Sequence, residues 1–299
     1  MRTIITLFLF IGTLLTYSYA KESEWRFAVV GDTHVPNAFT VQKIIPKLIE
    51  DKVEVVLFPG DIIQGGKGQN PKGMIEELYQ WKELISPLEK AGVKILVIRG
   101  NHEADVKGNN TRPWYRLISQ NLNLVESYKN VTFVGLDNYI DGEHSIDIQW
   151  FENALKNIPK KNIIVPFGHE PAFSCNTFHP VCLDANIDSR NKFWGLLEKY
   201  GVSFYFCGHS HQYNLSSITH DGKTIHQVVS GGGGGFLQPK RGGIINADGY
   251  QVKLIDFKSE TGYLLVTVSG NKLSTLWQSV YDGAVRHMPE QRKPHRAQR

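Results

Sequence analysis

Five apolar runs in this chain end in the same way, with a glycine followed at once by Asp, Asn or His. The carboxyl ends of parallel strands in an open α/β sheet converge on one crevice, so residues at those ends meet although they are distant in sequence. Glycine has no Cβ, so the backbone can turn sharply there and approach a bound group closely. The pattern predicts one site built from Gly31-Asp32-Thr33-His34, Gly60-Asp61, Gly100-Asn101-His102-Glu103, Gly168-His169-Glu170 and Gly208-His209-Ser210-His211.

From Trp25 onward, short apolar runs alternate with amphipathic stretches, which is typical of βα units feeding a largely parallel, buried sheet. After Tyr213, shorter runs joined by turns at Asp221-Gly222 and Ser269-Gly270-Asn271 predict antiparallel strands. The predicted strands are 27–30, 53–58, 93–98, 131–135, 163–167 and 202–207, followed by 215–218, 224–229, 250–257 and 263–268; the predicted helices are 40–52, 74–91, 146–157 and 188–200.

Composition excludes several classes of protein. Hydrophobic residues at 41% and charged residues at 21% of 299 argue against disorder, collagen and a multi-span membrane protein. A net charge of +4, evenly spread, gives no indication of a specific nucleic-acid partner. No low-complexity linker or repeat divides the chain, so we expect one domain over 21–285. Residues 286–299 are basic and nearly devoid of apolar side chains, which predicts a disordered tail, with a basic arm for anionic surfaces as the alternative.

Residues 1–20 have the pattern of a secretory signal peptide. Arg2 precedes an apolar run from Ile4 to Leu15, and Ser18-Tyr19-Ala20 supplies small residues where signal peptidase cleaves. An uncleaved anchor is the alternative, but the apolar run is shorter than the roughly 20 residues that span a bilayer. We therefore expect cleavage after Ala20, a mature chain without a transmembrane segment, and a secreted or periplasmic location.

The seven candidate ligands exceed the needs of one metal ion. A lone Gly-Asp is usually turn chemistry and a lone His is usually structural, but their repetition at strand ends indicates a metal centre. Two ions that share one Asp fit the count. Nitrogen and oxygen ligands without a thiolate favour Zn, Mn or Fe over Cu(I) or an iron–sulfur cluster, and the histidines argue against Ca or Mg alone. The candidates are Asp32, His34, Asp61, Asn101, His169, His209 and His211.

As a set, the five segments resemble the signature of calcineurin-like metallophosphoesterases. The resemblance implies an α/β fold, a four-layer α/β/β/α sandwich of two mixed sheets, with the site at its top edge. It also implies one ion on Asp32, His34 and His211, a second on Asn101, His169 and His209, and Asp61 bridging them.

The C-terminal part, with Val228-Val229-Ser230 before five glycines, more loosely resembles the acid-phosphatase-like branch. Purple acid phosphatases carry a tyrosine where this chain has Gln64, and usually a glycine where it has His34. The resemblance therefore does not extend to a typical purple ferric centre.

The expected chemistry is hydrolysis of a small phosphate ester. Two adjacent cations lower the pKa of a bridging water toward neutrality, so that a metal-bridging hydroxide attacks phosphorus directly. His102, beside Asn101 and not needed as a ligand, is the candidate to protonate the leaving oxygen. A secreted, non-catalytic protein that holds metal or a phosphorylated ligand is the alternative. The choice between monoester and diester, and the oligomeric state, stay open.

Two features near the site complete the expectations. The glycine run 231–235 lacks the Lys-Ser/Thr of a P-loop, so we expect a backbone loop close to the site and leave phosphate contact open. In an oxidising compartment Cys175 and Cys182 are close enough in sequence to form a disulfide after the His169 segment. Cys207, within an apolar strand, is expected to be a buried thiol.

Overall fold

The computed structural model describes residues 24–36, 39–65, 71–104, 111–140, 142, 144–174, 181–240 and 244–280, with only the backbone for 244–247. The segments 1–20 and 286–299 lie outside the described residues, so the signal peptide and the tail remain predictions. Within the described part, no helix combines the length and apolar character needed to cross a membrane.

The first sheet has five strands in the order β13-β12-β1-β2-β3. Its centre is β1 (Trp25–Val29), which pairs in parallel with β2 (Val55–Pro59) and antiparallel with β12 (Gly262–Ser269). The edges are β3 (Lys94–Ile98), parallel to β2, and β13 (Lys272–Ser279), antiparallel to β12. The sheet is therefore mixed, and its two edge strands, β3 and β13, come from segments far apart in the sequence.

The second sheet has eight strands in the order β10-β11-β8-β9-β7-β6-β5-β4. The strands β5, β6, β7 and β9 are mutually parallel, and the remaining pairs are antiparallel. The bounds are β4 (Leu124–Tyr128), β5 (Val131–Leu136), β6 (Ile163–Gly168), β7 (Phe204–Cys207), β8 (Tyr213–His220), β9 (Lys223–Ser230), β10 (Ile244–Ala247) and β11 (Tyr250–Lys258).

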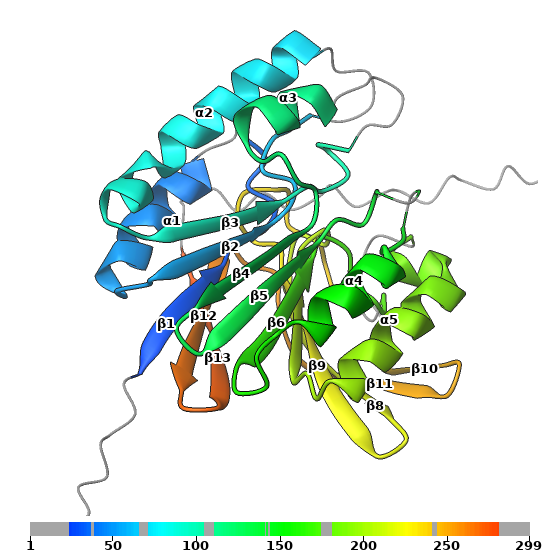
Figure 1. The fold of residues 1–299 in the computed structure, drawn as a ribbon. Coiled ribbons are helices and arrows are strands. Elements are labelled where there is room, and N and C mark those ends of the chain that lie inside the picture. Colours follow the sequence, from blue (N-terminus) through cyan, green and yellow to red (C-terminus); the bar gives the residue numbers. More distant parts are fainter. Residues whose placement is uncertain are drawn as a thin grey trace, which may run out of the picture.

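The two sheets pack face to face, and helices cover their outer faces (Figure 1). Side chains alternate along each strand, so Phe27 of β1 faces the other sheet while Ala28 faces the helices. Phe133 and Phe167 meet Phe27 in the apolar layer between the sheets. The helices are α1 (Phe39–Glu50), α2 (Pro71–Lys90) and α3 (Thr111–Leu117) on the first sheet, and α4 (Ile148–Lys156) and α5 (Ile187–Lys199) on the second, with a 3₁₀ turn at Leu183–Ala185 before α5.

This arrangement confirms the predicted α/β/β/α sandwich of two mixed sheets. The C-terminal strands do not form a sheet of their own, however: β12 and β13 complete the first sheet, and β8 to β11 extend the second. The expectation of a largely parallel sheet was too simple because each sheet recruits antiparallel strands from the C-terminal third. Helix α3 and strands β4, β10 and β13 were not predicted.

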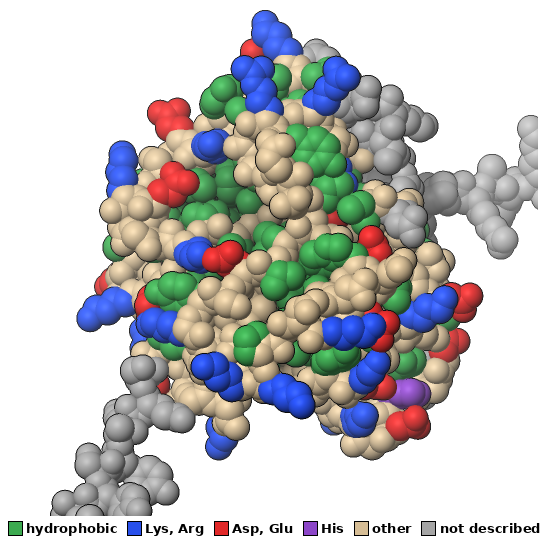
Figure 2. All heavy atoms as spheres, in the orientation of Figure 1, with side chains coloured by type: hydrophobic (Ala, Val, Ile, Leu, Met, Phe, Trp, Pro, Cys, Tyr) green, Lys and Arg blue, Asp and Glu red, His purple; other side chains and the backbone are tan. Residues whose placement is uncertain are grey.

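Charged side chains are dispersed over the face of the molecule that Figure 2 shows. Lys and Arg side chains lie among Asp and Glu side chains there, with apolar side chains between them. This face therefore offers no continuous basic surface of the kind that nucleic-acid binding requires.

Candidate metal centre

The predicted ligands follow strands of both sheets at the same edge of the sandwich. In the first sheet, Asp32, Asp61 and Asn101 come after β1, β2 and β3. In the second, His169 follows β6, and His209 and His211 follow β7. The structure brings these side chains together, as the strand-end argument predicts, so the site spans the boundary between the two sheets.

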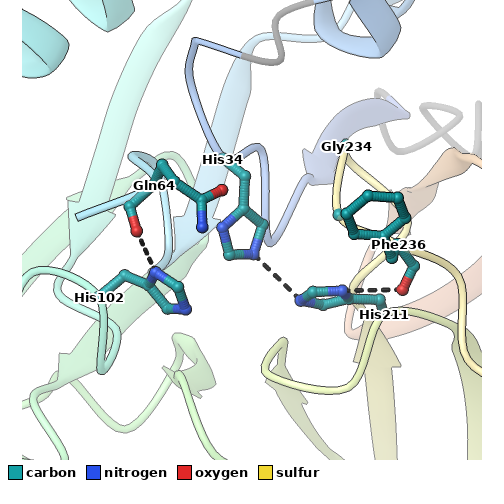
Figure 3. Close-up of a pocket in the computed structure, with 7 residues that line it drawn as sticks. His34, Gln64, His102, His211, Gly234 and Phe236 are labelled. Carbon is teal, nitrogen blue, oxygen red and sulfur yellow. Dashed lines mark hydrogen bonds between the residues drawn. The ribbon is translucent and has the colours of Figure 1, made fainter. Parts of the chain in front are cut away.

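One group of ligand atoms consists of Asp32, His34 and His211. One atom from each lies within 4.8 Å of the others. His34 Nε2 and His211 Nε2 are 3.0 Å apart, and His211 Nε2 is 3.7 Å from Asp32 Oδ1. The Nδ1–H of His211 donates to the carbonyl of Phe236 at 2.9 Å, which leaves Nε2 directed at His34 (Figure 3). This is the donor set that the resemblance assigns to one ion.

A second group contains Asp61, His169 and His209, again within 4.8 Å. His169 Nε2 lies 3.4 Å from Asp61 Oδ2 and 3.1 Å from His209 Nδ1. Asn101 Oδ1 is 3.0 Å from both imidazole nitrogens. The opposite nitrogen of each ring faces a carbonyl, His169 Nδ1 that of Pro59 at 2.8 Å and His209 Nε2 that of Val181 at 3.3 Å. These two carbonyl contacts fix the orientation of both rings, so that the other nitrogen of each ring faces the group of ligand atoms.

Asp61 connects the two groups. Its Oδ2 lies 3.9 Å from His34 Nε2, in the first group, and 3.4 Å from His169 Nε2, in the second. His102 Nε2 is also 3.9 Å from this oxygen, so His34, Asp61 and His102 form a third set with ligand geometry. The positions therefore allow His102 to act as a ligand as well as in the predicted acid role.

Four of the candidate ligands adopt backbone conformations with positive φ. The φ angles are 60° for Asp32, 48° for His34, 50° for Asp61 and 68° for His209. Such residues cost about 1–3 kcal/mol each and persist where the surroundings determine them, which is common at functional sites. Gly60, at φ 86°, makes the turn before Asp61.

Close packing holds these strand ends in place. A Cβ on Gly100 would lie 2.1 Å from Asp61 Oδ1, so only glycine fits there. Behind it, the buried Glu103 carboxylate accepts backbone N–H bonds from Gly100 at 2.7 Å, Asp61 at 2.9 Å and Ile63 at 3.0 Å. Burial, together with the nearby Asp61 charge, raises the pKa of Glu103 to about 7. Glu103 thus ties the second and third segments together.

The predictions from sequence did not assign roles to Glu103 or Asn138. Asn138 Oδ1 accepts the backbone N–H groups of His169 and Glu170, both at 2.8 Å, and so fixes the fourth segment. The available signals were weak. Glu103 directly follows His102, and Asn138 follows a strand like the ligands do but without a glycine before it.

Electrostatics in the centre are dominated by burial and by contacts between acids and imidazoles. Burial raises the pKa of Asp32 well above its ordinary value and lowers that of His34 well below its own. Burial alone would raise the pKa of Asp61, but His169, His102 and His34 hold it well below its usual range. Burial opposes the charged form of His169, yet Asp61 and Asp32 raise its pKa to about 10.

The donor set fits transition-metal ions. Two buried carboxylates and four imidazoles converge, without a thiolate, at atoms 3.0 to 3.9 Å apart. The buried His34 Nδ1 has no hydrogen-bond partner, so this ring is not held by a carbonyl from behind as His169 and His211 are. Nitrogen and oxygen donors in this mixture suit Zn, Mn or Fe.

The structure does not test the predicted disulfide. Cys175 lies outside the described residues, so the bridge to the buried Cys182 stays a prediction. Cys207 is fully buried in β7, and burial raises the pKa of its thiol, as expected for a structural cysteine.

The sequence matches the model of the calcineurin-like phosphoesterase family over residues 26–213, and the chain belongs to this family. The match includes all five glycine-led segments. Family membership and the clustered aspartates and histidines are both consistent with a site for divalent metal ions. No curated protein sequence matches the chain significantly.

The solved structures that share the fold include a plant phosphatase and a parasite protein. Purple acid phosphatase PPD1 from yellow lupin (Lupinus luteus) has a TM-score of 0.67 at 17% identity, with 86% of this chain and 52% of that chain covered. GAP50, described as the anchor in the inner membrane complex of Plasmodium, has a TM-score of 0.60 at 18% identity, with 88% and 86% covered. This chain thus spans about half the length of the lupin phosphatase.

Proposed function

We propose that this chain is a hydrolase of phosphate esters with a centre of two transition-metal ions, Zn, Mn or Fe. The observation that carries the proposal is the position of Asp61 Oδ2 between the two groups of ligand atoms, 3.9 Å from His34 Nε2 and 3.4 Å from His169 Nε2. One ion would be held by Asp32, His34 and His211, the other by Asn101, His169 and His209, with Asp61 shared.

When bound, such ions supply a water nucleophile active near neutral pH and neutralise charge on the phosphoryl group. The side chains supply the rest. His102 donates Nδ1–H to the carbonyl of Gln64, so its Nε2 faces Asp61. In its protonated form, Nε2 of His102 would give the proton to the leaving oxygen. Among the described residues that line the cavity beside these groups, none is Ser, Thr or Cys, which favours direct hydrolysis over a covalent phosphoenzyme.

A secreted or periplasmic location is part of the proposal and rests on residues 1–20. Expression of the full chain in a secreting host, followed by N-terminal sequencing of the exported protein, tests it. A new N-terminus at Lys21 is expected. An exported or retained protein that still begins at Met1 would contradict cleavage after Ala20.

Metal analysis and turnover together test the activity. Purified protein should contain two ions per chain and hydrolyse aryl phosphate monoesters or diesters, and chelation should abolish turnover until metal is restored. A panel of nucleotides and phosphosugars assayed alongside would define the substrate. Two ions bound without hydrolysis of any ester would instead support the alternative, a secreted protein that holds metal or a phosphorylated ligand.

A further inference from the structure

A cavity of about 110 Å³ opens beside the first group of ligand atoms. Figure 3 shows His34 in its middle, His102 and Gln64 on one side, and His211 with Phe236 on the other. The side chain of Phe236 is 52% exposed, unlike most large apolar side chains of the chain. An exposed aromatic ring in the wall of a cavity that also contains candidate ligands is suited to contact a bound molecule.

The backbone places Phe236 firmly. Gly233 N donates to Gly31 O at 3.0 Å and Gly235 N donates to Asp32 O at 3.1 Å, so the glycine run lies along the first segment. A Cβ on Gly235 would lie 2.3 Å from His211 Nδ1, which shows how closely the run passes this ring. The carbonyl of Phe236 itself accepts the Nδ1–H of His211 at 2.9 Å. The backbone that carries Phe236 is therefore held beside two candidate metal ligands, Asp32 and His211.

The part of the cavity wall that the glycine run forms carries no side chain before Phe236. Gly234 and Gly235 line the cavity directly, and Phe236 is the first side chain after them. None of the described lining residues is Lys, Arg, Asp or Glu. A second phosphate or a carboxylate in the alcohol part of an ester would find no cationic side chain among the described lining residues, whereas an uncharged aromatic group would find the Phe236 ring to stack on.

We propose that Phe236 forms a subsite for the alcohol part of the ester and that it selects uncharged, aromatic alcohol parts. This inference rests on the proposed function, because it assigns the phosphoryl group to the ligand side of the cavity. The alcohol part of the ester would then occupy the space in the cavity between His102 and Phe236. The side chain of Phe236 is thus assigned to specificity, whereas its backbone carbonyl orients His211.

Binding of phosphonates tests the subsite without turnover, because their C–P bond is not a phosphate ester bond. Calorimetry on the metal-loaded protein would compare benzylphosphonate, cyclohexylmethylphosphonate and 2,3-dihydroxypropylphosphonate. The wild-type protein should bind the benzyl compound about three- to tenfold more tightly than the cyclohexyl one, as expected for an aromatic pair. The dihydroxypropyl compound should bind most weakly.

Variants then assign the preference to the ring. Phe236→Leu should remove the benzyl-over-cyclohexyl preference and keep the preference over dihydroxypropyl, and Phe236→Ala should weaken both. Tyr79→Ala removes an equally exposed ring, at 52%, from the middle of α2 and should change no affinity. Metal content and thermal unfolding of each variant verify that the centre remains intact.

The results separate the two proposals. A benzyl preference that disappears in Phe236→Leu, in a protein that hydrolyses no ester, would support the subsite and overturn the proposed function. Hydrolysis with no benzyl preference, or with a preference that survives in Phe236→Leu, would overturn the subsite alone. An equal loss of affinity for all three phosphonates in both variants would assign Phe236 to supporting His211 and overturn the inference, as would no binding of any phosphonate.

Discussion

At the scale of single residues, one carboxylate oxygen carries much of the centre. Asp61 Oδ2 lies within 3.9 Å of nitrogen atoms from three imidazole rings, those of His34, His102 and His169. Asp61→Asn removes a charge shared by both ions, so we expect both to be lost together. Elemental analysis of the purified variant measures this, with Asp188→Asn on α5 as a control. Two tightly held ions per chain in Asp61→Asn would contradict the bridging role.

His102 has two possible roles that kinetics can separate. As a general acid it contributes roughly 10² to 10⁴ in rate, and most for strongly basic leaving groups. We therefore expect His102→Ala to keep both ions and to lose far more activity on alkyl and phenyl esters than on nitrophenyl esters. The measurement is kcat/KM across leaving groups of graded pKa. An equal loss for every ester, with lowered metal content, would instead make His102 a ligand.

Glycine positions give a matched pair of stability tests. Gly100→Ala places a Cβ 2.1 Å from Asp61 Oδ1, which should lower the free energy of unfolding by about 1–3 kcal/mol and weaken metal binding. Gly195→Ala, within α5 and with nothing within 4 Å of the new Cβ, should raise it by about 0.5–1 kcal/mol. Denaturant unfolding measures both. Changes of the same sign would refute the packing argument.

Residues beyond the ligands show where sequence reasoning stops. The ligand types and their glycines are visible because the same pattern recurs at five strand ends. Phe236 could not be assigned a role, because an exposed aromatic residue has no sequence signal and its position depends on contacts with Gly31, Asp32 and His211. Glu103 escaped for a similar reason, since its carboxylate acts on backbone groups rather than on a motif partner.

At the scale of elements, an ion pair joins the two sheets beside the centre. Arg99, after β3, donates from Nε and Nη2 to Asp137, after β5, at 2.6 and 3.0 Å, and both side chains are buried. Arg99→Met leaves a buried carboxylate without its partner and should lower the free energy of unfolding by about 3–5 kcal/mol.

A second substitution checks this explanation. Asp137→Asn keeps an oxygen for the Tyr139 N–H, which Asp137 Oδ1 accepts at 2.8 Å, and removes the charge. Arg99→Met combined with Asp137→Asn should therefore recover most of the loss in urea unfolding. A double variant as unstable as Arg99→Met alone would mean that lost packing, and not the unpaired charge, explains the effect.

Elements with strong periodicity were predictable, and edge elements were not. The central strand β2 is buried on both faces and β1 is exposed only at Arg26, so both read as apolar runs. The four predicted helices lie within a few residues of their predicted bounds. Strand β13 is an edge strand in which exposed and half-buried residues alternate, so its sequence has little apolar signal. Helix α3, seven residues long, is too short to show a helical period.

At the scale of the whole molecule, bound ions would connect the two sheets. The first sheet supplies Asp32, Asp61 and Asn101, and the second supplies His169 and His209. Protein in metal at about 100 times the dissociation constant should therefore melt roughly 5–10 °C higher than the same protein after a chelator has removed the ions. Differential scanning calorimetry with and without chelator measures this, and readdition of metal should restore it. An unchanged melting temperature would argue against ions held between the sheets.

Strand β1, the first strand in the described part of the chain, pairs on one side with β12, which is synthesised long after it. During translation, β1 and β2 can pair early, but one edge of β1 keeps its backbone groups unpaired until residues 262–269 emerge. The hydrogen bonds between β1 and β12 therefore form only after the whole second sheet, β4 to β11, has been synthesised. The export that we propose requires a chain that is still unfolded, and a sandwich that closes only when β12 pairs with β1 would leave time for it.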